Sequence, residues 1–157
     1  MHKHQRSDPS PEFRQRLVAP EADVDELGHI SNVAYVRWLQ DVATAHSDAV
    51  GFPTARYQGL GSIFVVRRHE IDYLRAAFAG DDLELTTHVA WFRGATSERR
   101  TRIVRCRDGL ELVRAATLWA FVAIDSGRPR RIPPAVSEAF YTTPARPSPD
   151  LERDGSR

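Results

Sequence analysis

The stretch that decides the fold is DELGHISNVAYVRWLQDVATAHSDAV, residues 25–50. Across residues 32–50, apolar side chains recur every three or four positions, which is the spacing of an amphipathic helix. They form two stripes, and a helix that is apolar on two sides is expected to be buried on two sides. Ser31 is a good N-cap residue, and Gly51 and Pro53 end the pattern. The stretch therefore predicts one long buried helix.

After this helix, and just before the loop that leads to it, the pattern is that of β-strands. Asp108-Gly109 separates two β-rich runs, and such a pair is a strong hairpin signal. The predicted strands are residues 13–18, 62–74, 82–92, 97–107 and 110–124. One long buried helix combined with these strands predicts an α+β fold, in which a five-stranded antiparallel sheet wraps around the helix.

Composition bounds the class of protein. The 157 residues, 41% of them hydrophobic and 27% charged, suit one soluble globular domain. We expect this domain over residues 13–140, with flexible tails at 1–12 and 141–157, because their prolines and polar residues bury too little apolar surface. The single cysteine, Cys106, excludes an intrachain disulfide and a cysteine-based zinc cage.

Charge gives a further limit. Lys+Arg is 22 and Asp+Glu is 21, so the net charge of +1 gives no reason to expect a nucleic-acid or membrane partner. There is no apolar run of the ~18 residues that cross a bilayer, and no signal-peptide core, so we expect a cytoplasmic protein. The histidines show no metal-ligand spacing, and His46, inside an apolar stripe, is expected to be a satisfied core or interface residue.

The loop before the predicted helix has the parts of an acyl-transfer or hydrolysis site. A helix N-terminus presents unpaired amide N–H groups and a positive dipole end, which can hold a developing oxyanion. Here the amides of residues 31–33 would form that oxyanion hole, and the Asp25 carboxylate would attack a carbonyl or activate water. The alternative is that Asp25 only caps a turn, as acidic residues before helices often do.

The same loop resembles the signature of hotdog-fold acyl-CoA thioesterases of the 4-hydroxybenzoyl-CoA thioesterase group. The positions that match this signature are Asp25, Gly28, His29, Asn32 and Tyr35. Similar stretches follow at residues 35–41, 70–75, 80–81, 121–125 and 128–133, so that the resemblance covers about residues 13–140. It implies the hotdog fold and hydrolysis of an acyl-CoA or acyl-carrier-protein thioester, with no metal and no cofactor other than coenzyme A as part of the substrate.

The resemblance also implies roles for single residues. Asp25 falls on the catalytic carboxylate, as nucleophile or general base, and Asn32 on the residue whose backbone N–H polarises the thioester carbonyl. His29 stands where related plant acyl-carrier-protein thioesterases have a functional His, although Leu27 departs from the Asn of those enzymes. Asp41 is a second candidate, because some hotdog branches use a carboxylate on the helix.

Substrate contacts are expected from arginines and aromatic residues. Arginine suits bidentate contact with phosphate, and the candidates for the phosphates of coenzyme A are Arg93, Arg99, Arg100, Arg130 and Arg131. Tyr35 is read as core or as a wall of the acyl pocket. The aromatic residues that could line a pocket are Phe52, Tyr57, Phe64 and Trp91.

Two alternative functions have to be weighed, and the resemblance also implies an oligomeric state. A hotdog hydratase or dehydratase commonly carries an Asn-Pro loop, which is absent here. A non-catalytic acyl-CoA-binding protein would need an output module, and the ~12 residues before the first strand are too few for one. The family pairs its subunits so that their sheets continue, with active sites between them, which implies a homodimer or homotetramer.

Overall fold

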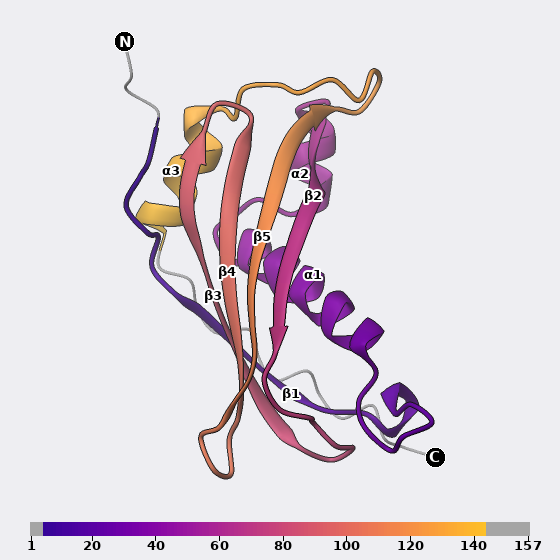
Figure 1. Ribbon diagram of the computed structural model, residues 1–157. Helices are drawn as coiled ribbons and strands as arrows, with labels where there is room; N and C mark the ends of the chain where they lie inside the picture. Colours follow the sequence, from indigo (N-terminus) through magenta and orange to yellow (C-terminus); the bar gives the residue numbers. More distant parts are fainter. Residues whose placement is uncertain (1–4, 144–157) are drawn as a thin grey trace.

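The structure is a computed structural model that describes residues 5–143 (Figure 1). Its elements are β1 (Phe13–Val18), the 3-10 helix η1 (Glu21–Asp23), α1 (Asn32–Ala49), α2 (Thr54–Gly59), β2 (Ser62–Tyr73), β3 (Asp82–Arg93), β4 (Thr96–Arg105), β5 (Glu111–Ala123) and α3 (Pro134–Thr142). The predicted long helix and five strands are confirmed to within a few residues. The short helices α2 and α3 were not predicted, because prolines precede or begin them and we read these only as strand and helix terminators.

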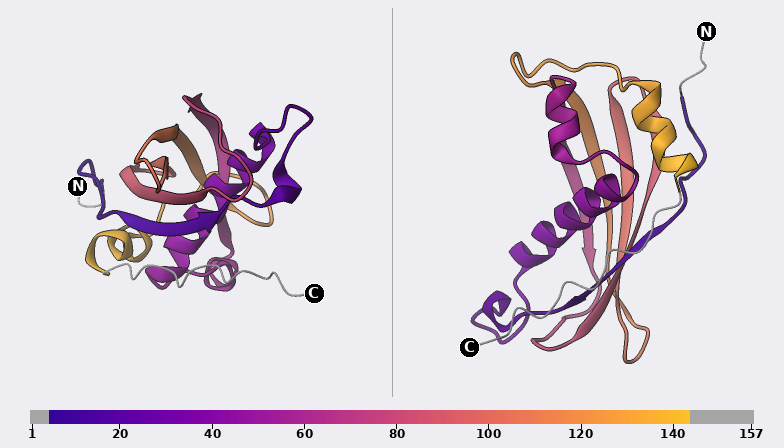
Figure 2. Two further views of the ribbon diagram at one scale, coloured as in Figure 1. Left: turned by 90° about the horizontal axis from the view of Figure 1, so that it is seen from below. Right: turned by 180° about the vertical axis from the view of Figure 1, so that it is seen from behind.

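The five strands form one antiparallel sheet in the order β1-β3-β4-β5-β2. This sheet is strongly curved, and α1 crosses its concave face, while α2 and α3 cover the same side near the far end (Figure 2). The expected α+β arrangement of a sheet around one helix is therefore confirmed. β1 and β2 are the edge strands, so each has one side without a strand partner among the described residues.

Part of the expected N-terminal tail runs beside β3. The Arg6 amide donates to the Phe92 carbonyl (3.2 Å), and the Phe92 amide donates back (2.9 Å). The Ser10 amide donates to the Val89 carbonyl (2.8 Å). Composition predicted a tail here because few apolar side chains are present, but backbone hydrogen bonds require none. Of the expected C-terminal tail, Tyr141 and Thr142 are instead the last residues of α3, while residues 1–4 and 144–157 lie outside the described residues.

The core divides into two clusters under α1. Beneath its N-terminal half lie Phe13, Leu83, Leu85, Ile103 and Val113, all at most 2% exposed. Beneath its C-terminal end lies a second, largely aromatic cluster. The expected burial of α1 on two sides is only partly realised, since Val33 is 73% exposed.

His46 and Arg99 lie between these clusters. The His46 ring stacks on Phe13 at 5.2 Å and meets the edge of Phe140 at 5.0 Å. Arg99 Nη1 donates to His46 Nδ1 at 2.8 Å, so Nδ1 is the acceptor and the imidazole is neutral. Burial, followed by the nearby charge of Arg99, lowers the pKa of His46 to about 2. The predicted core role of His46 is confirmed.

This histidine makes folding sensitive to pH. Between its unfolded pKa of 6.5 and its folded pKa of about 2, only the unfolded chain binds the proton, so stability falls as the pH falls below 6.5. Replacing His46 by Gln keeps an acceptor for Arg99 but removes the titration. From pH 7 to pH 5 the free energy of unfolding should drop by about 2 kcal/mol more in the wild type than in His46→Gln. Urea unfolding at both pH values measures this difference, and equal drops would contradict it.

Candidate active site

The loop between η1 and α1 is a tight turn that presents Asp25. Val24 and Ile30 form an antiparallel bridge, and the Asp25 amide donates to the His29 carbonyl at 2.7 Å. Gly28 has a φ of 81°, which side chains rarely tolerate, so glycine allows the chain to reverse here. The turn therefore fixes the backbone of Asp25 close to the start of α1.

The Asp25 carboxylate has one fixed oxygen and one free oxygen. Oδ1 accepts hydrogen bonds from the amides of Leu27 (2.9 Å) and His29 (3.2 Å), as a capping carboxylate would. Oδ2 has no hydrogen-bond partner within residues 5–143, and the side chain is exposed. Asp25 thus combines the turn-capping contact with an oxygen that is available for chemistry.

The first turn of α1 leaves one amide without a partner. Ser31 is confirmed as the N-cap, because its Oγ accepts the Val33 N–H at 3.2 Å. The Ser31 carbonyl accepts the Ala34 N–H at 3.0 Å. No acceptor among the described residues contacts the N–H of Asn32, the first residue of the helix. This N–H lies at the positive end of the helix dipole, where it can donate to a negatively charged oxygen.

A second loop, between β2 and β3, is hydrogen-bonded to this turn and to the first turn of α1. The Ile30 amide donates to the Ala77 carbonyl (2.9 Å), and the Ala77 amide donates to the Tyr35 hydroxyl (3.1 Å). The ring of His29 meets the edge of Phe78 at 5.4 Å. Residues on both sides of Asn32 are therefore tied to one segment of backbone.

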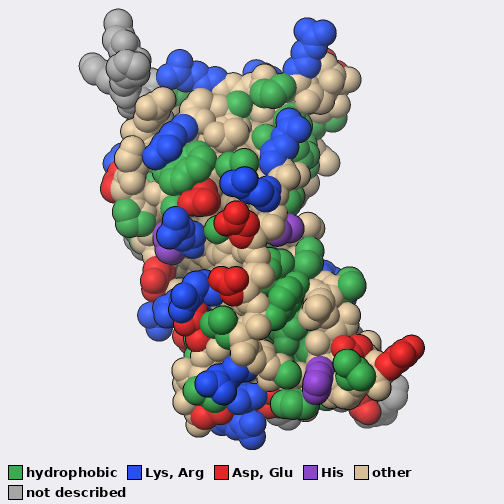
Figure 3. All heavy atoms as spheres, viewed as in Figure 1, with side chains coloured by type: hydrophobic (Ala, Val, Ile, Leu, Met, Phe, Trp, Pro, Cys, Tyr) green, Lys and Arg blue, Asp and Glu red, His purple; other side chains and the backbone are tan. Residues whose placement is uncertain are grey.

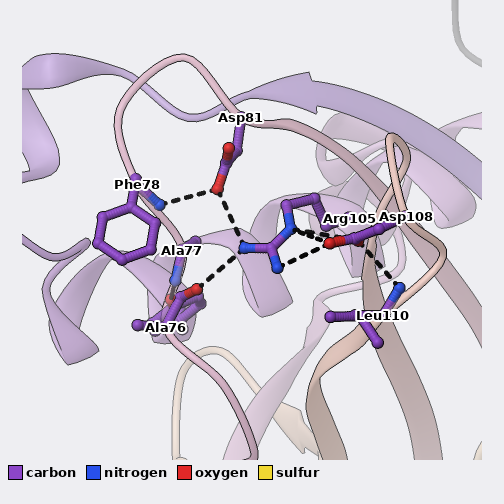
Figure 4. A network of polar contacts seen from close by, with 8 residues as sticks. Ala76, Ala77, Phe78, Asp81, Arg105, Asp108 and Leu110 are labelled. Atoms are coloured by element: carbon purple, nitrogen blue, oxygen red, sulfur yellow. Dashed lines mark hydrogen bonds and ion pairs between the residues drawn. The ribbon is translucent and has the colours of Figure 1, made fainter.

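That segment is anchored by Arg105, a residue that sequence reasoning missed (Figure 4). Arg105 is 7% exposed, and its Nη2 donates to Asp108 at 2.9 Å, which holds the pKa of the Asp108 carboxyl below its usual value. Its Nη1 lies 3.6 Å from Asp81 and 3.4 Å from the Ala76 carbonyl. Asp81 in turn accepts the Phe78 amide at 2.9 Å. The ion pairs thus connect the β4–β5 turn to the loop that supports the start of α1.

Tyr35 lies in the core, as one of its two expected roles requires, whereas Asp41 lies away from the Asp25 loop. Tyr35 is 3% exposed, and burial raises the pKa of its hydroxyl, so its visible role is to pack and to hold Ala77. Asp41 is exposed on α1, nine residues after Asn32, which is about 13 Å along the axis and on the opposite side of the helix. Asp41 is therefore not brought together with Asp25.

The candidate phosphate-binding arginines are not near Asp25 within one chain. Arg93 ends β3 and stacks on Trp91 at 4.6 Å, and Arg130 donates to Ser62 Oγ at 2.7 Å. Arg131, exposed, follows in the same loop. These residues lie at the end of the sheet opposite the α1 N-terminus (Figure 1), and β3, which ends at Arg93, is itself about 36 Å long.

Arg99 and Arg100 are separated from that group and from each other. Arg99 is buried on the helix side of β4, where a surface phosphate does not reach it. Arg100 is exposed on the outer face and forms an ion pair with Glu98 at 3.3 Å. Figure 3 shows that basic and acidic side chains are interspersed over this outer face.

Exposed apolar side chains surround the Asp25 loop. The exposed fractions are 78% for Leu27, 73% for Val33, 44% for Tyr73, 48% for Leu74 and 44% for Phe78. Large apolar groups gathered at one place on a surface mark a contact site. The surroundings of Asp25 therefore have the character of an interface.

In the described part of the chain, no group of three or more His, Cys, Asp or Glu side chains is arranged to hold a metal ion. None of the described helices is long and apolar enough to cross a membrane.

Solved structures of several thioesterases are similar to this fold. The structure superposes on a 1,4-dihydroxy-2-naphthoyl-CoA thioesterase from Synechocystis with a TM-score of 0.77 and 15% identity, over 83% of this chain and 96% of that chain. A DHNA-CoA thioesterase from Staphylococcus aureus superposes with a TM-score of 0.76 and 20% identity, over 82% of this chain and 88% of that chain. A probable thioesterase from Bartonella henselae superposes with a TM-score of 0.70 and 25% identity, over 79% of this chain and 99% of that chain.

Sequence comparison assigns the family. A comparison with curated proteins finds no significant match. The model of the thioesterase-like superfamily matches residues 19–140, which include the Asp25 loop, the whole sheet from β2 onward and most of α3. The resemblance to hotdog-fold thioesterases is thereby confirmed, and the chain belongs to the thioesterase-like superfamily.

Proposed function

We propose that this thioester hydrolase cleaves an acyl-CoA, with Asp25 and the backbone N–H of Asn32 as its catalytic groups. The observation that carries the proposal is the pairing of two free groups on one anchored segment. Asp25 keeps one carboxylate oxygen without a partner, and seven residues later the first amide of α1 is free as well. An attacking carboxylate and a fixed oxyanion donor are what thioester cleavage requires.

The reaction adds water across the thioester and gives a carboxylic acid and a thiol. In one route Asp25 Oδ2 attacks the carbonyl carbon, the C–S bond breaks, and water hydrolyses the resulting anhydride. In the other route Asp25 takes a proton from water, which attacks directly, and the departing sulfur gains a proton. In both routes the carbonyl oxygen becomes negatively charged, and the Asn32 N–H donates to it. The amide of His29 keeps the Asp25 carboxylate in place.

Coenzyme A is the carrier that the available observations favour. The similar proteins from Synechocystis and Staphylococcus aureus are described as CoA thioesterases. The exposed arginines Arg93, Arg130 and Arg131 can contact phosphate, since guanidinium groups bind it in a bidentate manner. An acyl-carrier protein as donor is the alternative.

We further propose a dimer in which β2 pairs with β2 of a second copy. Among the described strands β2 is a 12-residue edge strand, and long unpaired edges invite pairing. The apolar side chains of Tyr73 and Leu74 at its end are exposed, and a second subunit would bury them. A two-fold axis makes this pairing antiparallel, so that the start of β2 lies beside the end of the partner's β2.

This arrangement resolves the separation of Asp25 from the arginines. Arg130 contacts Ser62 at the start of β2, while Tyr73 at its end lies 5.6 Å from Tyr35 on the first turn of α1. Antiparallel pairing therefore brings Arg130 of the partner subunit toward the Asp25 loop. Each active site would combine the chemistry of one subunit with the phosphate contacts of the other.

The role of Asp25 is tested with a matched pair of substitutions. Asp25→Asn should lower kcat for thiol release from a panel of acyl-CoAs by about a hundredfold or more, because Asn is neither a nucleophile nor a base. Asp41→Asn, at another exposed aspartate, should retain the wild-type rate. If Asp41→Asn is the inactive variant, the loop carboxylate is the wrong assignment.

The composite site is tested by mixing defective subunits. Asp25→Asn lowers kcat, and Arg130→Met should raise KM for acyl-CoA about tenfold. In a reassorted equal mixture, each heterodimer contains one intact site and one with both defects. Activity at low substrate should then recover to about one quarter of the wild-type value, because half of the dimers are mixed. Activity no higher than the mean of the two parent variants would contradict the shared site.

A further inference from the structure

A cavity of about 130 Å³ lies beneath the C-terminal half of α1, away from the Asp25 loop. Its walls are largely apolar, and the aromatic residues among them are Phe52, Tyr57, Phe64, Phe92, Trp119 and Phe140. Ala43, which also lines it, follows Asn32 by eleven residues, or about 16 Å along the helix. The cavity is therefore distinct from the α1 N-terminus of the same chain.

A buried cation without a counter-ion lines this cavity. Arg99 is 6% exposed, and its Nη1 donates to His46 Nδ1 (2.8 Å) and to Thr87 Oγ1 (3.1 Å). Both acceptors are neutral, and within residues 5–143 no carboxylate pairs with Arg99 and no acceptor contacts its Nε or Nη2. Burial lowers the pKa of Arg99 to about 10, so it keeps its charge at neutral pH. Buried charges are normally paired, so Arg99 is suited to pair with an anion that enters the cavity.

A second donor in the same cavity is also unsatisfied. The Nε1 of Trp119 is buried and has no hydrogen-bond partner among the described residues. In the antiparallel register Trp119 lies opposite Ser97, two residues before Arg99 on β4, so the two side chains share the concave side of the sheet. An indole N–H is a donor only, like the guanidinium, so both groups need an acceptor.

The size and walls of the cavity limit the ligand. Apolar cavities of about 150 Å³ hold one benzene ring, so this one suits a single aryl ring or a short alkyl chain. The acidic lining residue, Asp48, is exposed and forms no ion pair with Arg99. A ligand whose polar end accepts hydrogen bonds and carries one negative charge then matches the two donors, Arg99 and Trp119.

We propose that this cavity binds the carboxylate of a small aryl or short alkyl group, held by Arg99 and Trp119. Such a carboxylate has two possible sources. It is a free carboxylic acid, the product class of thioester hydrolysis, or it is the distal carboxylate of an acyl group still attached to its carrier. In the second case the thioester would lie at the Asp25 loop of the partner subunit, which the proposed dimer brings toward the start of β2, where Ile63 and Phe64 line the cavity. The binding itself does not depend on the assignment of Asp25.

Calorimetry with benzoate and its neutral analogue benzyl alcohol tests the free acid. The wild type should bind benzoate at least about tenfold more tightly, because hydrogen bonds to charged groups are the stronger ones. Arg99→Met should abolish this preference, and Trp119→Phe, which keeps the ring, should weaken it. Arg102→Met, on the outer face of the same strand, should leave it unchanged. Asp48→Asn should tighten benzoate binding by removing a nearby negative charge.

Kinetics test the attached carboxylate. In this case Arg99→Met should lower kcat/KM for glutaryl-CoA about tenfold relative to pentanoyl-CoA, which lacks the distal carboxylate. If Arg99→Met loses benzoate binding but keeps the wild-type ratio of kcat/KM for glutaryl-CoA to kcat/KM for pentanoyl-CoA, the ligand is the free acid. If this ratio falls in Arg99→Met, the ligand is the distal carboxylate of the acyl group. If Arg99→Met does not fold, Trp119→Phe and Asp48→Asn carry the same comparisons. A wild type that prefers the carboxylate in neither assay overturns the proposal.

Discussion

The site depends on a single unpaired hydrogen-bond donor at the start of α1. Ser31 uses its side chain for the Val33 amide and its carbonyl for the Ala34 amide, and Asn32 N–H is left over. An N–H without a partner at a helix N-terminus lies at the positive end of the helix dipole. It therefore stabilises a negatively charged group, or the negative end of a polar bond such as a carbonyl. The fold places this donor at the rim of the sheet, because α1 crosses the concave face and must begin at one end of it.

The surrounding structure keeps that donor and the Asp25 carboxylate in fixed positions. The Asp25 turn is closed by its own hydrogen bonds, and the loop below is tied to it through Ala77. Arg105 then connects this loop to the hairpin between β4 and β5. Catalytic groups that are held in advance avoid a cost of reorganisation in the transition state. The ion pairs of Arg105 and the buried packing of Ile30, Tyr35 and Ala77 both hold this end of the sheet.

Local patterns in the sequence predicted most of the fold and the central residues of the site. The helical spacing after Ser31 and the Asp108-Gly109 pair act over a few positions, and the structure places a helix and a hairpin there. The identities of Asp25 and Asn32 as candidates came from loop chemistry and from the family resemblance, and their catalytic roles stay predictions. Arg105 was missed because two of its partners, Asp81 and Ala76, are far from it in the chain. Arg99 was placed with the surface arginines, since alternation along a strand does not tell which side is the concave one.

The most direct measurement compares Asn32→Pro with Asn32→Ala in thioester hydrolysis. Proline is favoured at the first position of a helix, and Ser31, with φ −62° and ψ 142°, already has the conformation that precedes a proline. Asn32→Pro thus removes the N–H and leaves α1 in place, while Asn32→Ala removes the side chain and keeps the N–H. We expect kcat to fall by about a hundredfold or more in Asn32→Pro and to stay near wild type in Asn32→Ala. Equal rates in two folded variants would contradict a role for this amide in polarising the thioester.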